Sequence, residues 1–123
     1  MTIACRGVRG AITCAKNSRD DIVESTHALL TAVIDANGIT PAEVASIWFT
    51  TTTDLFAEFP AVAARQMGFT DTALMNAHEM TVPGALPMCI RLIMHWNTTK
   101  AQSEITHVYL RGATVLRPDL KKS

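Results

Sequence analysis

The sequence predicts an α/β (α+β) fold, a single domain in which a mixed β-sheet of about five strands packs with two long helices. Its 123 residues are room for one domain, so we expect residues 1–123 to form one unit. Hydrophobic residues make up 48% of the chain, which is enough for a core without disulfide bonds. Runs rich in β-branched and aromatic residues alternate with runs of helical spacing, which is typical of mixed α and β structure.

The first third of the chain predicts a strand followed by a long helix. Residues 3–13 alternate across two faces and contain two glycines, which either permit a close approach to the strand backbone or mark a bulge. Ser18 is a good helix N-cap, and three acidic residues follow in the first turns, where negative charge suits the helix dipole. Apolar residues then recur at helical spacing until Gly38, which we expect to end the helix.

The middle of the chain predicts a short helix, a strand, another helix and a second strand. Thr40 and Glu43 match a capping box around a proline, which favours a short helix there. Residues 44–53 are rich in β-branched and aromatic residues and predict a central strand. The turn, helix and strand expected after it cover residues 54–60, 61–67 and 74–80.

The last third predicts a loop, a helix, two strands and a tail. Residues 82–84 are loop-like, and residues 86–96 predict a helix because three apolar residues lie on one face and the proline is tolerable in a first turn. The remaining elements expected are a strand over 104–110, a turn at 111–112, a strand over 113–116 and a mobile polar tail over 117–123.

This order of elements leaves one face of the predicted sheet uncovered. About five strands backed by two long helices have helices enough for one face only. A sheet face that carries apolar residues needs a cover, and another copy of the chain is the simplest candidate. An ordinary core within one chain is the alternative.

The balance of charges and the cysteines exclude several classes of protein. Lys plus Arg and Asp plus Glu number 11 each, so zero net charge gives no attraction to nucleic acid. The longest stretch without a charged residue, 80–90, is well short of a membrane span. Arg6 and Arg9 interrupt any apolar run near the start, so no secretory leader is expected. Three cysteines without paired spacing favour reduced thiols in the cytoplasm over disulfides or structural zinc.

Motif searches leave one kind of chemistry. The histidines occur in no zinc-binding spacing, no serine lies in a glycine-flanked elbow, and residues 7–10 lack the spacing and lysine of a phosphate loop. We therefore expect no metal site, and acyl transfer and phosphoryl transfer also lack the residues they need. Arginine outnumbers lysine by seven to four, and arginine forks bind carboxylates. Residues that suit a small dianion with a hydroxyl group are Arg9, Arg65, Glu79, Arg91, Tyr109 and Arg117. The alternative is ordinary surface charge.

Short motifs spread through the chain carry a resemblance to one enzyme family. They are RGVRGA at 6–11, TTDL at 52–55, FPA at 59–61, EM at 79–80, CIR at 89–91, HVYL at 107–110 and VLRPDL at 115–120. On these motifs, residues 3–120 resemble the monofunctional chorismate mutases of the trimeric AroH class. The resemblance implies a homotrimeric pseudo-α/β barrel with sites in clefts between subunits. It also implies the rearrangement of chorismate to prephenate, a step toward phenylalanine and tyrosine that needs no cofactor.

The resemblance implies roles for individual residues. Arg91 matches the arginine that contacts the ether oxygen of chorismate, and Glu79 matches the acceptor for the ring hydroxyl. Arg9 and Tyr109 match residues around a substrate carboxylate. The other matches are the apolar walls Phe59 and Leu116, and Arg65 and Arg117 near the mouth, the latter on the tail.

Two positions depart from the family pattern. Asn76 stands where well-known members carry a cysteine, and its amide can still donate to the hydroxyl. Val62 stands where a lysine lies near the entrance, so steering of the dianion should be weaker. Asn76 and Glu79 have opposite parity, so they serve sites on either side of a subunit boundary unless a bulge joins them. Two other functions stay open: a trimeric enamine or imine deaminase-like protein, and a non-catalytic module that binds carboxylate metabolites.

Overall fold

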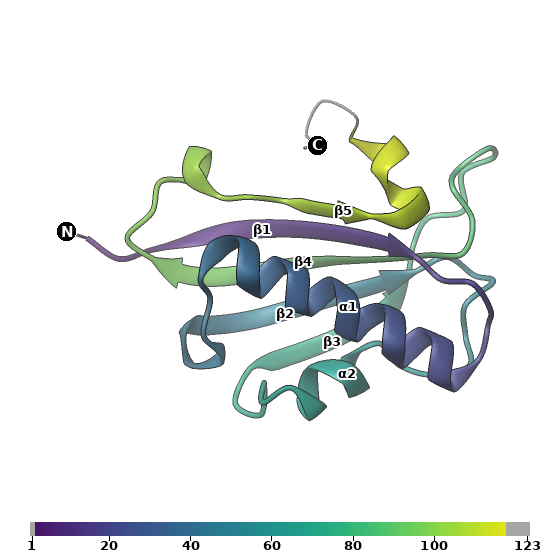
Figure 1. Ribbon diagram of the computed structural model, residues 1–123, viewed down its shortest axis with the longest axis horizontal. Helices are drawn as coiled ribbons and strands as arrows, with labels where there is room; N and C mark the ends of the chain where they lie inside the picture. The colour runs from purple at the N-terminus through teal and green to yellow at the C-terminus, as the bar shows by residue number, and fades with distance from the viewer. Residues whose placement is uncertain (1, 118–123) are drawn as a thin grey trace.

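In the computed structural model, which describes residues 2–117, one mixed sheet carries two α-helices on one face (Figure 1). The strands are β1 (Ala4–Thr13), β2 (Val44–Thr51), β3 (Ala73–His78), β4 (Cys89–Thr98) and β5 (Val108–Leu110). Their order in the five-stranded sheet is β3-β2-β4-β1-β5. β4 is antiparallel to β1 and β2, whereas β5 runs parallel to β1, and β3 runs parallel to β2. The predicted mixed sheet in a single domain is confirmed.

The first helix, α1 (Arg19–Asn37), begins and ends where the sequence predicts. The Ser18 hydroxyl accepts a hydrogen bond from the Asp21 N–H at 3.1 Å, and Gly38 ends the helix with a left-handed φ of 72°. The helix packs closely on β1 because Gly10 has no side chain. A Cβ built there would lie 3.2 Å from Leu29 Cδ1, so the glycine permits the close approach expected at this strand.

The middle elements follow the prediction with small shifts. The capping-box segment forms a 3₁₀ turn at Pro41–Glu43, where the Thr40 N–H donates to Glu43 Oε1 at 3.2 Å. The helix predicted over 61–67 is α2 (Ala61–Gln66), and it packs against α1 and β3. The strand predicted over 74–80 stops at His78, so Glu79 lies just beyond its end.

The helix predicted over 86–96 is wrong, because this segment is β4 at the centre of the sheet. Alternate residues of β4 are buried, and these are Ile90, Leu92, Met94 and Trp96. That period of two is a strand pattern. It was hidden because Ile93, on the opposite face, is apolar too, and its spacing to Ile90 and Met94 imitates a helix. One long helix therefore covers the sheet, not two.

The end of the chain also differs from the prediction. The strand predicted over 104–110 is paired only at Val108–Leu110, after a 3₁₀ turn at Gln102–Glu104. The strand predicted over 113–116 is wrong, because Arg111–Leu116 forms a 3₁₀ helix, η3. Arg111 has a positive φ of 55°, and its guanidinium donates to Ser25 Oγ of α1 at 3.0 Å, which turns the chain back across the end of β1. Of the predicted mobile tail 117–123, residues 118–123 lie outside the described residues.

The two faces of the sheet have different surroundings. On the face toward α1 and α2, strand residues such as Val8, Ile47 and Met94 are fully buried. On the opposite face no α-helix packs within residues 2–117; the 3₁₀ helix η3 covers only the part near Ala11 and Cys89, and Trp48 and Met75 are each 51% exposed. The predicted uncovered face is confirmed, and we refer to it as the open face. No helix of the described part is long and apolar enough to cross a membrane.

Candidate functional site

One row of residues crosses the open face from strand to strand. In β4, Arg91 is paired with Ala11 of β1 on one side and with Thr50 of β2 on the other. Ala11 is in turn paired with Tyr109 of β5. Residues in register on neighbouring strands project to the same face, so these side chains share one side of the sheet. The predicted residues Arg91 and Tyr109 are thereby placed one strand apart.

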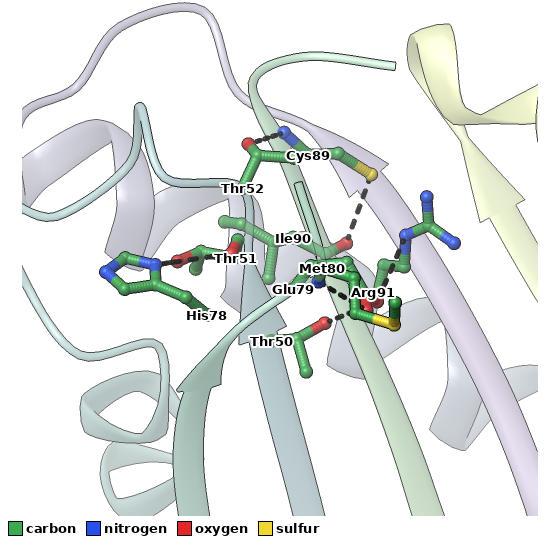
Figure 2. A network of polar contacts seen from close by, with 9 residues as sticks. All are labelled: Thr50, Thr51, Thr52, His78, Glu79, Met80, Cys89, Ile90 and Arg91. Atoms are coloured by element: carbon green, nitrogen blue, oxygen red, sulfur yellow. Dashed lines mark hydrogen bonds and ion pairs between the residues drawn. The ribbon is translucent and has the colours of Figure 1, made fainter. Parts of the chain in front are cut away.

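The carboxylate of Glu79 lies beside Arg91, with Glu79 Oε2 3.8 Å from Arg91 Nε (Figure 2). The Thr50 hydroxyl donates to the same carboxylate oxygen at 3.3 Å, and the other oxygen accepts the Met80 N–H at 3.1 Å. The Glu79 N–H donates to Thr51 O at 2.8 Å, which anchors the residue just after β3. The structure thus brings together the two residues predicted to be catalytic.

The Nε atom of Arg91 is buried and has no hydrogen-bond partner among residues 2–117. The distance of 3.8 Å to Glu79 is too long for a hydrogen bond, although it is short enough for an ion pair. A buried donor without an acceptor is rare in proteins, because it loses its bonds to water without replacing them. The Nε–H of Arg91 is therefore not satisfied by any acceptor among the described residues, although the Glu79 carboxylate lies close to it.

The segment before Arg91 is fixed by hydrogen bonds from the loop after β2. Thr52 bonds to both backbone groups of Cys89, each at 3.0 Å, and the Asp54 carboxylate accepts the Met88 N–H at 3.1 Å. Met88 has a positive φ of 53°, so the chain bends sharply there. These contacts fix the start of β4 and hence the position of Arg91. Thr52 and Asp54 belong to the TTDL motif but were given no role from sequence.

The thiol of Cys89 lies buried next to the Arg91 guanidinium. Burial raises the pKa of this thiol, and the positive charge of Arg91 partly offsets the rise. Cys89 thus stays a neutral thiol that packs against the arginine. Cys89 and Thr50, which holds Glu79, were not predicted as site residues; only the register of the sheet reveals them.

A small apolar cluster closes the site at the β5 side. Its buried members are Ala11, Cys89 and Ala113, and the partly buried ones are Leu86, Tyr109 and Leu116. Two predicted residues, Tyr109 and Leu116, therefore pack against the same small cluster. Leu116 reaches this place because η3 folds the chain back toward β1, with the Gly112 N–H donating to Thr13 Oγ1 at 3.0 Å.

Arg9 and Arg117 each lie near His107. Arg9 is exposed on the open face, two residues before Ala11. Its backbone N–H donates to His107 Nδ1 at 3.0 Å. Burial lowers the pKa of His107, and the charges of Arg9 and Arg117 lower it further. The site thus has a cationic edge in which the imidazole is held neutral.

The other predicted residues, Phe59, Arg65 and Asn76, lie at the β3 edge of the sheet. Asn76 accepts the Ala61 N–H at 3.1 Å at the start of α2. Phe59 is 62% exposed beside an open hollow of about 300 Å³, which Asn76 also lines. Arg65 lies near enough to Glu58 to lower the pKa of that carboxyl, after larger effects of the Phe59 N–H and Arg19. One chain therefore does not bring these three residues to Arg91.

Asn76 and Glu79 are separated, as their parity predicts. Asn76 is in register with Phe49, whose side chain is buried on the helix side of the sheet. Glu79 instead contacts Thr50 and Arg91 on the open face. No bulge joins the two residues. Within the described residues, the predicted site residues therefore fall into two separate groups, one around Arg91 and one around Phe59.

Comparison with known proteins finds one family throughout. A family model described as "Chorismate mutase type I" matches residues 5–120. The chain is 46% identical over 119 residues to chorismate mutase AroH of Thermus thermophilus, covering 96% of this chain and 98% of the relative. It is 40% identical over 116 residues to chorismate mutase AroH of Bacillus subtilis (strain 168), covering 94% and 91%. The fold is similar to that of a chorismate mutase from Clostridium thermocellum, with a TM-score of 0.87, 50% identity, and coverage of 89% and 97%.

Proposed function

The chain belongs to the chorismate mutase type I family, and from this premise we propose how its residues catalyse the rearrangement of chorismate to prephenate. The enzyme is an isomerase that acts in the biosynthesis of aromatic amino acids. The family assignment replaces both the deaminase-like and the non-catalytic alternatives.

Arg91 stabilises the negative charge that develops on the ether oxygen of chorismate. In this unimolecular reaction the C–O bond breaks ahead of C–C bond formation, so the ether oxygen becomes partly negative in the transition state. A fixed cation near that oxygen binds the transition state more strongly than the substrate and lowers the barrier. The observation that carries this assignment is the buried Nε of Arg91, which has no acceptor within the described chain.

Glu79 positions Arg91 and accepts the ring hydroxyl of the substrate. Thr50 and the Met80 N–H each bond one of its carboxylate oxygens, so the carboxylate is oriented before substrate binds. Each carboxylate oxygen has a second lone pair, which leaves room for a hydroxyl donor. A carboxylate held in this way also orients the flexible substrate, which restricts it to its reactive conformer.

The complete site is shared between neighbouring subunits of a homotrimer, in the manner of a pseudo-α/β barrel. One subunit provides Arg9, Arg91, Tyr109, Leu116 and Arg117, with Glu79. Its neighbour provides Phe59, Arg65 and Asn76 from the β3 edge. Two observations support this arrangement: the half-sites lie apart within one chain, and the open face exposes Trp48 and Met75. A shared site would also gather arginines of two chains in one place, which provides local positive charge for a dianion although the net charge of the chain is zero.

The cytoplasm is the compartment we propose for the reaction. Cys5, Cys14 and Cys89 are all free thiols, which a reducing environment preserves.

Mixing two inactive variants tests the shared site. Arg91→Ala disables one half-site and Arg65→Glu disables the other, and purified samples of each should consume little chorismate. After the two variants are unfolded and refolded together, trimers form at random. A site is intact when each of its two halves comes from the variant that keeps it, which holds for about one site in four, so roughly a quarter of the wild-type activity should return. Each variant refolded alone is the control. If both half-sites act within one chain, the mixture stays inactive and the shared site is refuted.

A further inference from the structure

The outer edge of β1 is closed by side chains where β5 does not reach. β5 pairs with β1 only from Gly10 to Ile12. Before that point, the Gln102 side-chain amide bonds both backbone groups of Gly7, at 3.0 and 2.7 Å. His107 then accepts the Arg9 N–H with Nδ1 at 3.0 Å. Two side chains thus replace the missing strand along this edge.

We propose that His107 is a positioning residue for the reaction, because its neutral imidazole holds the backbone of Arg9 and thereby directs the Arg9 side chain toward the substrate. The proposal rests on the proposed function, in which Arg9 binds a substrate carboxylate. A backbone N–H can only donate, so Nδ1 must be unprotonated to accept it. The neutral ring therefore carries its proton on Nε2, and a protonated ring cannot make this bond.

The surroundings of the ring keep it neutral at working pH. The charged groups that shift it are Arg9 of β1 and Arg117 after η3, both cationic, and burial acts in the same direction. Each effect lowers the pKa of His107 below its usual value near 6.5. Acid below that value protonates the ring, breaks the bond to Arg9 and loosens the strand edge beside the site. The predicted consequence is weaker substrate binding in acid.

Two substitutions separate the bond from the charge. His107→Asn places an amide oxygen close to the position of Nδ1 and does not titrate, whereas His107→Leu removes the acceptor. We expect KM of the wild type to rise as the pH falls below about 6.5, with kcat little changed. His107→Asn should keep a low KM that does not change over this range. His107→Leu should raise KM at every pH, by about three- to tenfold for one lost hydrogen bond.

Several outcomes overturn the proposal. The proposal is overturned if His107→Leu has the KM of the wild type at pH 7. It is also overturned if the KM of His107→Asn still rises in acid as that of the wild type does. A KM that falls in acid also overturns it, because the added positive charge would then attract the dianion more than the lost bond weakens binding. The carboxylates of chorismate titrate equally for all variants, so the comparison between variants removes their contribution.

Controls distinguish this proposal from the proposed function. If Arg9→Ala leaves KM unchanged, the carboxylate-binding role of Arg9 fails; if Arg9→Ala raises KM but His107→Leu does not, only the present proposal fails. Gln102→Leu removes the neighbouring contact at the strand edge without changing a titratable group. Its KM should therefore still rise in acid, as that of the wild type does. A long-range ¹H–¹⁵N spectrum of the wild type must show a proton on Nε2 of His107. A proton on Nδ1 at pH 7 overturns the proposal even if His107→Leu fails to fold.

Discussion

Replacing Arg91 by citrulline removes the positive charge while the length and shape of the side chain stay the same. Citrulline keeps the Nε–H, so the buried donor of Arg91 remains in place beside Glu79. The substitution therefore separates two contributions that Arg91→Ala removes together, the charge and the hydrogen bond. The side chains of both residues are 34% exposed, so the fold does not depend on a deeply buried charge at this position.

The size of the charge effect can be worked out from Coulomb's law. At an effective dielectric constant of about 20, which suits a partly exposed site, two unit charges about 3 Å apart attract by roughly 5 to 6 kcal/mol. If about half a unit of charge develops on the ether oxygen, the stabilisation is roughly 3 kcal/mol. Removing it should lower kcat by about 10²-fold, since each 1.4 kcal/mol is about tenfold. Loss of the donor in Arg91→Ala should add about another 10².

The assay measures the loss of chorismate absorbance at saturating substrate, with circular dichroism and the oligomeric state as checks on folding. Arg91→Lys is the matched control, because lysine keeps the charge but lacks the Nε–H. If citrulline retains kcat within about threefold of the wild type, the charge of Arg91 does not stabilise the transition state and the electrostatic argument is refuted.

Three further predictions concern stability and pH. Gly10→Ala should destabilise the fold by about 1 to 2 kcal/mol in urea unfolding, because the new methyl group meets Leu29 and Val33 at 3.2 and 3.3 Å; unchanged stability would show that α1 yields freely. Hydrogen bonds from Trp96 and from the Thr40 N–H lower the pKa of Glu43 in the folded state. The ionised carboxylate therefore contributes to stability above pH 4.5, and this contribution is lost as the pH falls through the folded-state pKa. The difference in urea midpoint between wild type and Glu43→Gln should therefore shrink in acid, and a constant difference contradicts this linkage. The wild-type kcat should be nearly flat from about pH 6 to 9, because the proposed rearrangement transfers no proton; a sharp bell would implicate a histidine in the chemical step.

The sequence predicts correctly those helices and strands whose ends depend on residues close by in the chain. The caps of α1, Ser18 and Gly38, are such signals, because each is satisfied by hydrogen bonds within its own turn. β4 was missed because its character depends on burial across the sheet, which a single segment does not contain. With an apolar Ile93 on the open face, the pattern of β4 fits either period until its neighbours β1 and β2 are known.

Prediction of the site from sequence is limited for the same reason, because it depends on contacts between distant segments. The residue types Arg91 and Glu79 were predicted from the family motifs, but their contact requires β2 to place Thr50 and the end of β3 beside β4. No spacing along the chain encodes that arrangement. Thr52 and Asp54 are a middle case: their motif was recognised, while their role in fixing the start of β4 is evident only from the hydrogen bonds.

The long distance between Arg91 and Glu79 matters for the proposed catalysis. A bidentate ion pair would satisfy the guanidinium and bury most of its charge against the carboxylate, leaving little for a developing negative charge elsewhere. At 3.8 Å, Glu79 attracts Arg91 without bonding Nε, while Thr50 and Met80 bond the carboxylate from other directions. The arginine is therefore oriented but not satisfied. In the proposed mechanism, the energetic cost of that unsatisfied donor is relieved when the substrate supplies an acceptor, and most fully when that acceptor is the partly negative oxygen of the transition state.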